Sequence, residues 1–269
     1  MKRAEKFREW LDRLHPSGLL YSTYEHRLLA ELDRDRLPQH IAVLADGNRR
    51  WARANAPGEP LVVGYRAGAD KLKQFVDWSD EAGVPFVTLW VLSTDNLSRS
   101  ADDELMPLLE VIATMVTDLA ATGRWRVQTV GDLEMLPAEV SATLRAAGER
   151  TAEVDGMHVN VAVAYGGRHE LRDAVRELLA EKAERGETLA EVAANLDIDE
   201  IGDHLYTRGQ PDPDLIIRTS GEQRLSGFLM WQSAHSEFYF CEALWPDFRK
   251  VDFIRALRSY EQRERRYGR

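Results

Sequence analysis

Short apolar runs alternate with longer amphipathic segments along most of this chain. The runs are rich in β-branched and aromatic residues and predict six strands, at residues 40–45, 86–92, 125–130, 157–165, 214–217 and 238–241. The segments between them repeat apolar residues every third or fourth position, which predicts helices at residues 67–82, 102–122, 137–155 and 170–185. Strands that alternate with helices need crossover connections. We therefore expect an α/β fold with a mainly parallel six-stranded sheet flanked by helices.

The remaining segments set the expected domain organisation. Residues 1–39 are interpreted as an amphipathic N-terminal helical segment, and residues 40–269 as one main domain. The polar, acidic stretch 184–203 is predicted to be helical, as an excursion or as an extra helical hairpin. The charged C-terminal stretch 251–269 is either a solvated helix face or a functional tail.

Composition and charge exclude several classes of protein. Hydrophobic residues make up 44% of the 269 residues and charged residues 30%, which excludes disordered and collagen-like chains. The formal net charge of −10 argues against nonspecific binding of nucleic acid. Cys241 is the only cysteine, so an intrachain disulfide and a cysteine-based metal cluster are excluded, and we expect a cytoplasmic protein. The longest apolar stretches are far shorter than the ~20 residues that cross a bilayer.

Candidate chemistry gathers in the loops that follow three of the predicted strands. These loops read DGNRRW at residues 46–51, STDNLSR at residues 93–99 and RTSGEQRLS at residues 218–226. In open α/β sheets, ligands bind beyond the carboxyl ends of the strands. Arginine forks, hydroxyl groups and the N–H groups at a helix start all suit phosphate oxygens. Two basic loops together with a carboxylate fit two diphosphates better than one.

A second carboxylate, Glu237, stands just before the last predicted strand. It could share a Mg²⁺ ion with Asp46 and a diphosphate, because Mg²⁺ is held by one or two carboxylates together with phosphate oxygens. These hard oxygen ligands fit Mg²⁺ rather than zinc.

Each of these residues also has an ordinary structural explanation when it is taken alone. Asp46 is equally well explained as a helix cap, and Asn96 could cap a helix that begins near Ser98. Arg218 or Arg224 in isolation would more often form a surface ion pair than bind a ligand. The coincidence of three such clusters at strand ends is what favours a ligand site.

These motifs, taken together, resemble those of a known family. They are HIAVLADGNRRWA at residues 40–52, STDN at 93–96, YGGR at 165–168, DLIIRTSGE at 214–222 and WQSAHSE at 231–237. Their residues and order resemble the undecaprenyl diphosphate synthase family, the cis-prenyltransferases, from residue 40 to the C-terminus. The segments GYR at 64–66 and RYGR at 266–269 are most similar to the short-chain actinobacterial branch, which makes (2Z,6E)-farnesyl diphosphate.

The resemblance implies an α/β enzyme, a prenyl transferase that uses Mg²⁺ to condense isopentenyl diphosphate with an allylic diphosphate. Asp46 and Glu237 match its Mg²⁺ ligands, and Asn96 matches an asparagine implicated in proton removal. Residues that match the allylic diphosphate cradle are Gly47, Asn48, Arg49 and Arg50, and those that match the isopentenyl diphosphate site are Arg218, Arg224 and Ser226. Further residues expected beside the substrates are Trp51, Tyr65, Ser93, Thr94, Asp95, Leu97, Arg99 and Leu225. Because an amide is a poor base, we expect Asn96 to position the substrate while a diphosphate oxygen or a nearby group receives the proton.

Some positions depart from the pattern of the long-chain relatives. Arg49 stands where glycine is usual, Tyr65 where histidine is common and Leu97 where tryptophan is common. We expect Arg49 and Arg66 to supply positive charge in the allylic site. Val91 replaces the alanine of long-chain relatives, so it is predicted to narrow the apolar tunnel and to limit the length of the product.

Several alternatives follow from the same residues. The expected primer is geranyl diphosphate, with farnesyl diphosphate as the other candidate, and a longer polyprenyl product is the alternative to a short one. A non-catalytic subunit of a heteromeric prenyltransferase is less well supported, because Asp46, Arg50, Arg218 and Arg224 are all kept. A phosphatase with a nucleophilic strand-end aspartate would need a second carboxylate where Asn48 stands. The family further implies a homodimer, and peripheral contact with a membrane is left open.

Overall fold

The computed structural model describes residues 31–99 and 102–263. Contacts along the chain divide it into two compact units, Pro38–Phe248 and a smaller one made of Met1–Leu37 and Arg249–Arg269. All six strands lie in the larger unit: β1 (His40–Leu44), β2 (Phe86–Trp90), β3 (Arg126–Val130), β4 (His158–Ala162), β5 (Leu215–Arg218) and β6 (Glu237–Phe240). The predicted N-terminal helix and the RYGR motif fall outside the described residues, apart from positions 31–39. The predicted boundary between residues 39 and 40 stays a prediction.

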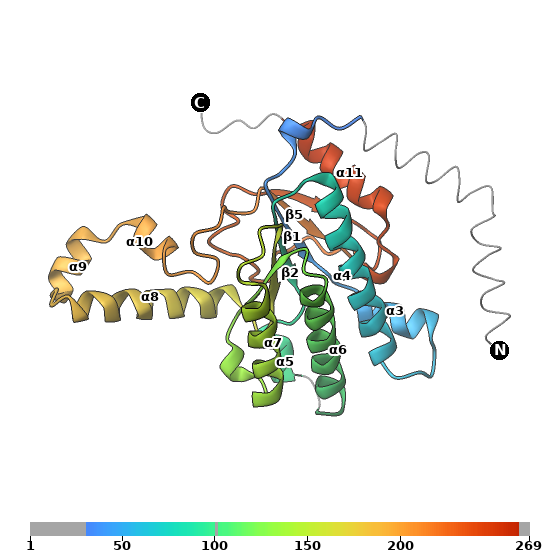
Figure 1. The fold of residues 1–269 in the computed structure, drawn as a ribbon, viewed down its shortest axis with the longest axis horizontal. Helices are drawn as coiled ribbons and strands as arrows, with labels where there is room; N and C mark the ends of the chain where they lie inside the picture. Colours follow the sequence, from blue (N-terminus) through green and yellow to red (C-terminus); the bar gives the residue numbers. More distant parts are fainter. Residues whose placement is uncertain (1–30, 100–101, 264–269) are drawn as a thin grey trace. The chain divides into compact units, whose positions relative to one another are not determined.

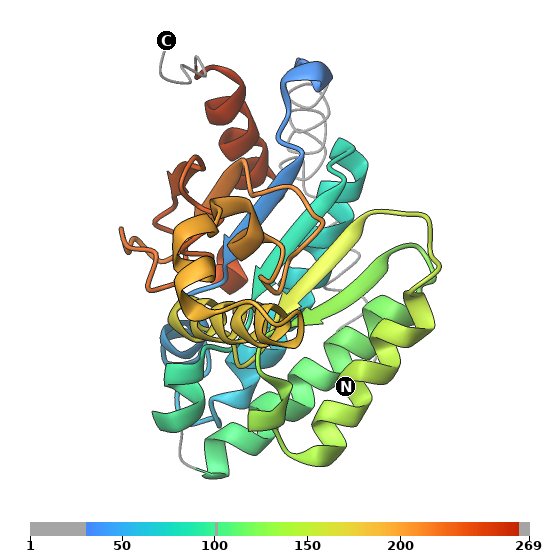
Figure 2. The same ribbon diagram turned by 90° about the vertical axis from the view of Figure 1, so that its left-hand side faces the viewer.

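The six strands form one sheet in the order β3-β4-β2-β1-β5-β6, and every neighbouring pair is parallel (Figures 1 and 2). The predicted mainly parallel sheet is therefore confirmed. β1 lies near the middle and all five of its residues are buried, as expected for a strand that is covered on both faces. The register aligns Leu44, Trp90 and Arg218, so the carboxyl ends of β1, β2 and β5 meet at one level.

Helices occupy the segments between the strands, as the periodicity predicts. The helices of the larger unit are α3 (Asn48–Asn55), α4 (Val62–Ala82), α5 (Thr94–Arg99), α6 (Asp102–Ala121), α7 (Ala138–Thr151), α8 (Gly167–Glu184), α9 (Leu189–Asn195) and α10 (Ile198–Gly202). Helices α4, α6 and α7 pack side by side against the sheet (Figures 1 and 2). Within the described ranges, none of the helices is both long and apolar enough to cross a membrane.

The acidic stretch after β4 is helical, as predicted. Helix α8 extends away from the sheet, and α9 and α10 return alongside it (Figure 1). Both short helices begin with capping boxes, Thr188 with Glu191 and Asp197 with Glu200, which satisfy the first backbone N–H groups of each helix.

In its described residues, 31–37 and 249–263, the smaller unit contributes a short 3₁₀ turn, η1 (Arg34–Arg36), and the helix α11 (Lys250–Glu261). The two are joined by a hydrogen bond of 2.7 Å from the backbone N–H of Asp33 to the carboxylate of Glu261. Residues 34–36 and 250–261 therefore belong together although they stand near opposite ends of the chain.

One face of the sheet is covered by a loop instead of a helix. Phe228 and Leu229 are fully buried against Ala42 and Leu44 of β1, together with Tyr165. Because side chains alternate along a strand, these residues of β1 share the face that also carries Trp90 and Arg218. The loop at residues 225–229 therefore packs on this face of the sheet, near the carboxyl ends of β1, β2 and β5.

Helix α3 lies against α4 at an unusually close approach. A Cβ atom at Gly64 would overlap the backbone carbonyl oxygen of Asn48 and would lie 2.9 Å from Cβ of Ala52. A Cβ atom at Gly68 would overlap the side-chain amide of Asn48. These two glycines therefore allow the start of α3, which follows Asp46, to sit against α4.

We predict that Gly64→Ala lowers the free energy of unfolding by about 1–3 kcal/mol, because the added methyl group forces α3 away from α4. The matched control is Gly148→Ala within α7, where a Cβ atom would lie at an ordinary 3.6 Å from the carbonyl oxygen of Val127. This control should be neutral or up to ~1 kcal/mol more stable. Urea denaturation of both variants checks the prediction, and equal stabilities would contradict it.

Candidate active site

A cavity of about 470 Å³ opens where the carboxyl ends of β1, β2 and β5 meet. Its lining includes four arginines and three carboxylates, which come from the three loops identified in the sequence. Ten predicted site residues line it: Asp46, Arg49, Arg50, Val91, Ser93, Asp95, Asn96, Arg218, Arg224 and Ser226. Sequence reasoning did not assign the other five lining residues to the site: Leu44, Ala45, Trp90, Leu92 and Glu222. The lining of the cavity therefore combines charged side chains with apolar ones.

An ion pair between a buried arginine and a partly exposed aspartate joins two of the loops. Nη2 of Arg218, the last residue of β5, lies 3.2 Å from Oδ2 of Asp46, and the arginine side chain is only 6% exposed. Nη2 of Arg50 lies 3.6 Å from the other carboxylate oxygen. Burial lowers the pKa of the Arg218 guanidinium, and the charge of Asp46 opposes this effect. Asp46 thus holds a desolvated positive charge at the base of the cavity.

Asp46 is not a helix cap, contrary to the alternative from the sequence. The N-cap of α3 is Gly47, with φ of +114° and no side-chain hydrogen bond to the helix start. A Cβ atom at Gly47 would lie 2.9 Å from the Leu244 side chain, so both conformation and space require glycine here. The first turn of α3 therefore has no side-chain cap, and its backbone N–H groups face the region of Asp46.

The loop after β5 contains strained backbone and is held in place by hydrogen bonds from Arg218. Ser220 and Ser226 adopt positive φ values of 78° and 54°, which are unfavourable for residues other than glycine. Nη1 of Arg218 donates to Oγ of Ser226 at 3.0 Å and to the backbone carbonyl of Arg224. The guanidinium of Arg224 is 63% exposed and pairs with Glu222. One arginine thus organises the loop while the other stays near solvent.

Two buried polar groups in this loop lack a hydrogen-bond partner among the described residues. They are the Nε–H of Arg218 and the hydroxyl of Ser220. An unpaired buried donor is costly, so such groups call for an explanation such as a ligand. Donors of this kind suit the oxygens of a phosphate group.

The loop after β2 begins a helix earlier than predicted. Helix α5 starts at Thr94, and the Ser93 hydroxyl accepts the backbone N–H of Asn96 at 3.0 Å. The prediction that Asn96 could cap a helix beginning near Ser98 is therefore wrong, since Ser93 is the capping residue and Asn96 lies inside the helix. The side chains of Ser93 and Asn96 both line the cavity.

Three predicted site residues with described side chains contact other parts of the protein and do not line the cavity. Asn48 packs against Gly64 and Gly68, and Trp51 donates from Nε1 to Asp247 at 2.8 Å. Thr94 is buried, and its backbone N–H donates to the Tyr165 carbonyl at 3.1 Å.

Three other predicted residues, all with described side chains, are also absent from the cavity lining. Leu97 is half-buried in α5, Leu225 packs on the core cluster, and Tyr65 hydrogen bonds to Glu104. Arg99 ends α5, and its side chain is outside the described part of the chain. A motif residue can therefore shape the site without lining it.

Trp90, which lines the cavity, belongs to a cluster of aromatic rings whose other members are buried behind it. The ring of Trp90 stacks on Phe228 with centroids 5.0 Å apart and an interplanar angle of 4°. Tyr165 meets both rings edge-on. The Tyr165 hydroxyl donates to the buried carboxylate of Glu170, which also accepts from Nε2 of Gln232 at 3.1 Å. Burial raises the pKa of Glu170, and these hydrogen bonds oppose that effect. Buried aromatic contacts and hydrogen bonds thus hold the side chain of Trp90 in place.

Glu237 does not reach Asp46 within one chain. It is the first residue of β6 and pairs with Leu215, which in turn pairs with Ile41. Its backbone is therefore three residues before the level of Leu44, about 10 Å from the carboxyl ends of the strands. A residue that precedes a strand in a parallel sheet lies at the edge opposite to a residue that follows one. The two carboxylates predicted to share an ion are consequently not brought together in the same chain.

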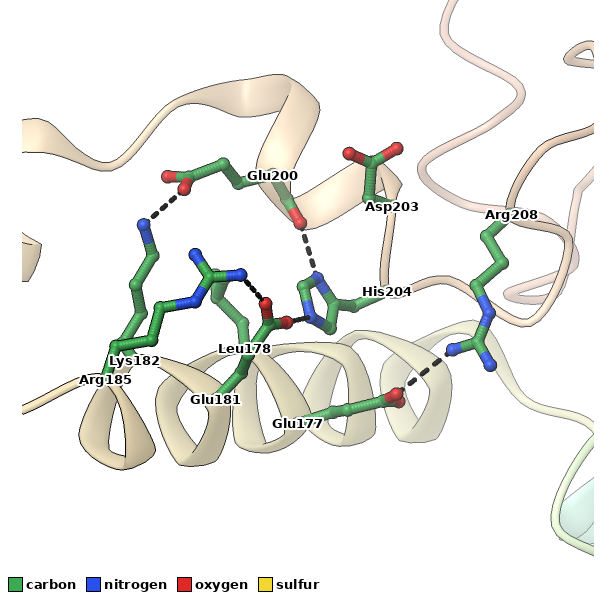
Figure 3. Close-up of a pocket in the computed structure, with 9 residues that line it drawn as sticks. All are labelled: Glu177, Leu178, Glu181, Lys182, Arg185, Glu200, Asp203, His204 and Arg208. Carbon is green, nitrogen blue, oxygen red and sulfur yellow. Dashed lines mark hydrogen bonds and ion pairs between the residues drawn. The ribbon is translucent and has the colours of Figure 1, made fainter.

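A second cavity, of about 400 Å³, lies between α8 and the α10 region (Figure 3). His204 donates from Nδ1 to the Glu200 carbonyl at 2.7 Å, and its Nε2 lies 2.8 Å from Glu181. Lys182 pairs with Glu200, and Arg208 pairs with Glu177 at 3.0 Å. The charges of these side chains are thus balanced by one another, which explains how the helical excursion is held on α8.

Comparison with known proteins agrees with the geometry of the first cavity. A prenyltransferase family model, described as undecaprenyl diphosphate synthase, matches residues 44–268. A (2Z,6E)-farnesyl diphosphate synthase from Thermobifida fusca is 58% identical over 249 residues, covering 93% of this chain and 97% of that protein. An isoprenyl transferase 1 from Streptomyces avermitilis is 56% identical over 250 residues, covering 93% of this chain and 96% of that protein.

A solved structure supports the same assignment. Lavandulyl diphosphate synthase from Lavandula x intermedia, crystallised with dimethylallyl diphosphate, superposes with a TM-score of 0.80 at 32% identity. The match covers 87% of this chain and all of the plant chain (100%). On the strength of the family model and of these identities, the chain belongs to the undecaprenyl diphosphate synthase family of prenyltransferases.

Proposed function

We propose that this chain joins isopentenyl diphosphate to an allylic diphosphate, with geranyl diphosphate as the expected primer, and releases a short-chain Z-prenyl diphosphate such as (2Z,6E)-farnesyl diphosphate. In this reaction the bond from the allylic carbon to its diphosphate breaks, and a carbon–carbon bond to the isopentenyl unit forms. The isopentenyl unit then loses a proton to give the new double bond. The relatives named as (2Z,6E)-farnesyl diphosphate synthase support the short product.

The observation that carries the proposal is that one cavity is lined both by four arginines and by apolar side chains. A prenyl diphosphate combines the same two properties, since a highly charged head is attached to a hydrocarbon tail. The arginines are Arg49, Arg50, Arg218 and Arg224, and the apolar lining includes Trp90, Val91 and Leu92. The Nε–H of Arg218 is also buried without a partner among the described residues.

The two diphosphates would occupy different loops. We assign the allylic diphosphate to Arg49, Arg50 and the start of α3, and isopentenyl diphosphate to Arg218, Arg224 and Ser226. The positive charges then surround the bond that breaks, where negative charge grows on the leaving diphosphate. Asn96 lines the same cavity and is proposed to orient the isopentenyl unit, because an amide cannot readily accept a proton.

The residues of the cavity also fit Mg²⁺, provided that Asp46 and a diphosphate hold the ion together. Among the described residues, there is no group of three or more histidine, cysteine, aspartate or glutamate side chains able to hold a metal ion. Mg²⁺ commonly binds through one or two carboxylates, water and substrate phosphates, so Asp46 with a diphosphate would suffice. When bound, the ion would neutralise charge on the departing diphosphate. Asp46 keeps both oxygens at the cavity, one toward Arg218 and one toward Arg50.

Other parts of the functional assignment stay predictions. We expect a homodimer in the cytoplasm, with no nucleic-acid partner, and peripheral membrane contact only if longer products are made. The alternative functions, a longer-chain synthase and a non-catalytic subunit, are outcomes of the assays that follow.

Replacing Asp46 by asparagine should abolish Mg²⁺-dependent turnover, because the amide keeps the shape of the carboxylate but loses its charge. The assay gives the purified chain labelled isopentenyl diphosphate, geranyl diphosphate and Mg²⁺. Incorporation by the wild type supports catalysis, and lack of incorporation would favour the non-catalytic subunit. Near-normal activity of Asp46→Asn at saturating Mg²⁺ would exclude Asp46 as the metal ligand. Thermal unfolding of the variant verifies that it remains folded.

Arg218→Lys should raise the KM for isopentenyl diphosphate about ten-fold or more, because one ammonium group cannot replace the separate nitrogens that reach Asp46 and Ser226. The matched variant Arg224→Lys should raise it only a few-fold, since that exposed side chain acts mainly through its charge. Steady-state kinetics with each substrate varied in turn checks both values. If only the KM for the allylic substrate rises, the two diphosphate sites are assigned the wrong way round.

Val91→Ala should lengthen the product by at least one isoprene unit with little change in the rate of the first condensation. Val91 lines the cavity beside Trp90, and a close-packed wall yields to a growing chain only at a cost of about 1–3 kcal/mol. The control is Val87→Ala, which removes the same atoms from a fully buried position of β2 that is absent from the cavity lining. Chromatography of dephosphorylated products against chain-length standards gives the result. If active Val91→Ala gives an unchanged distribution of product lengths, chain length must be limited instead by Leu89, Leu97 or α6.

A further inference from the structure

Three side chains from three different helices meet beside the cavity. The Tyr65 hydroxyl of α4 donates a hydrogen bond to Oε1 of Glu104, near the start of α6. Nη1 of Arg49 in α3 lies 3.9 Å from the same carboxylate oxygen. Arg49 lines the cavity, whereas Tyr65 and Glu104 do not. Any effect of these two residues on a ligand must therefore pass through Arg49.

The chemistry of the three groups indicates which of them holds the others in place. Tyr65 is buried, and burial together with the hydrogen bond to Glu104 raises the pKa of its hydroxyl well above the ordinary value. The hydroxyl therefore stays protonated and remains a donor, which holds Glu104 as an acceptor. The side chain of Glu104 is 25% exposed while that of Arg49 is 54% exposed. A fixed carboxylate thus holds a mobile guanidinium, rather than the reverse.

A restraint on the Arg49 side chain is expected to favour the binding of a phosphate group. An exposed arginine loses much side-chain freedom when it binds a phosphate, and that loss weakens binding. The close contact of Asn48 with Gly64 and Gly68 fixes the backbone of α3, but it does not fix the Arg49 side chain. The carboxylate of Glu104 supplies a restraint on the guanidinium itself, at the edge of the cavity.

We infer that Tyr65 and Glu104 are positioning residues that hold the guanidinium of Arg49 ready for the diphosphate of the allylic substrate. The inference rests on the proposed function, and it assigns Tyr65 a role through Glu104 and Arg49 in place of direct contact with substrate.

The test is a double-mutant cycle with Tyr65→Phe, Glu104→Gln and Arg49→Ala. Each of the first two variants should raise the KM for geranyl diphosphate about three- to ten-fold, with kcat and the KM for isopentenyl diphosphate nearly unchanged. In the Arg49→Ala background the same two substitutions should change the KM for geranyl diphosphate by less than about two-fold, because the group that they position is gone.

A matched control separates positioning from helix packing. Lys73 of α4 and Asp118 of α6 form another ion pair between the same two helices, at 3.1 Å, and neither lines the cavity. Asp118→Asn should leave both KM values unchanged. If Asp118→Asn raises the KM as much as Glu104→Gln does, or if the effects persist in the Arg49→Ala background, the role is only structural. An unchanged or lower KM for geranyl diphosphate in Glu104→Gln would equally overturn the inference.

Binding of inorganic pyrophosphate, measured by titration calorimetry, distinguishes failure of this inference from failure of the proposed function. If the wild type shows no turnover but Tyr65→Phe and Glu104→Gln weaken pyrophosphate binding only when Arg49 is present, the positioning role holds and the proposed reaction is wrong. If turnover is normal and pyrophosphate affinity does not depend on Tyr65 or Glu104, the reaction holds and the positioning role is wrong.

Discussion

The ion pair between Arg218 and Asp46 is the interaction on which the rest of the site depends. Taking a guanidinium out of water is costly unless a charge and hydrogen bonds replace the lost solvent. Arg218 is 6% exposed, so its position is stable only while Asp46 and the loop that carries Ser226 stay where they are. The pair therefore ties the ends of β1 and β5 to each other and fixes the loops that leave them.

Much of this arrangement follows from the order of residues along the chain. Parallel strands bring their carboxyl ends to one edge, so Asp46, Ser93 and Arg218 were expected on the same side of the sheet. They meet because β1 lies between β2 and β5, an order that was not predicted from the sequence. Strand and helix positions were predicted within a few residues because the runs are strongly periodic. The apolar pattern did not predict α5, which begins at Thr94, where the Ser93 hydroxyl accepts the backbone N–H of Asn96.

The remaining errors share a physical origin, since a sequence motif does not tell which way a side chain points. Asn48 stands inside the DGNRRW motif, but two glycines on the next helix leave just enough room for it against α4. Tyr65 is drawn to a carboxylate that is 39 positions away in the sequence. Glu237 was placed near Asp46 because it adjoins a strand, yet it precedes β6 whereas Asp46 follows β1. In a parallel sheet this order along the chain puts the two residues at opposite edges, and the chemistry of the two carboxylates gave no sign of it.

The four arginines of the cavity differ in how well each is prepared for a negative charge. The side chains of Arg49, Arg50 and Arg224 are about half exposed or more, at 54%, 47% and 63%, so each must lose freedom and solvent to hold a phosphate. Arg218 has already lost its side-chain freedom and its solvent, because it becomes buried when the protein folds. A charge that is already fixed binds an anion without first losing side-chain freedom, whereas exposed charges mainly attract and retain it. In the proposed assignment the helix and loop arginines must therefore be ordered by the diphosphates that they bind, whereas Arg218 at the strand end meets isopentenyl diphosphate already ordered.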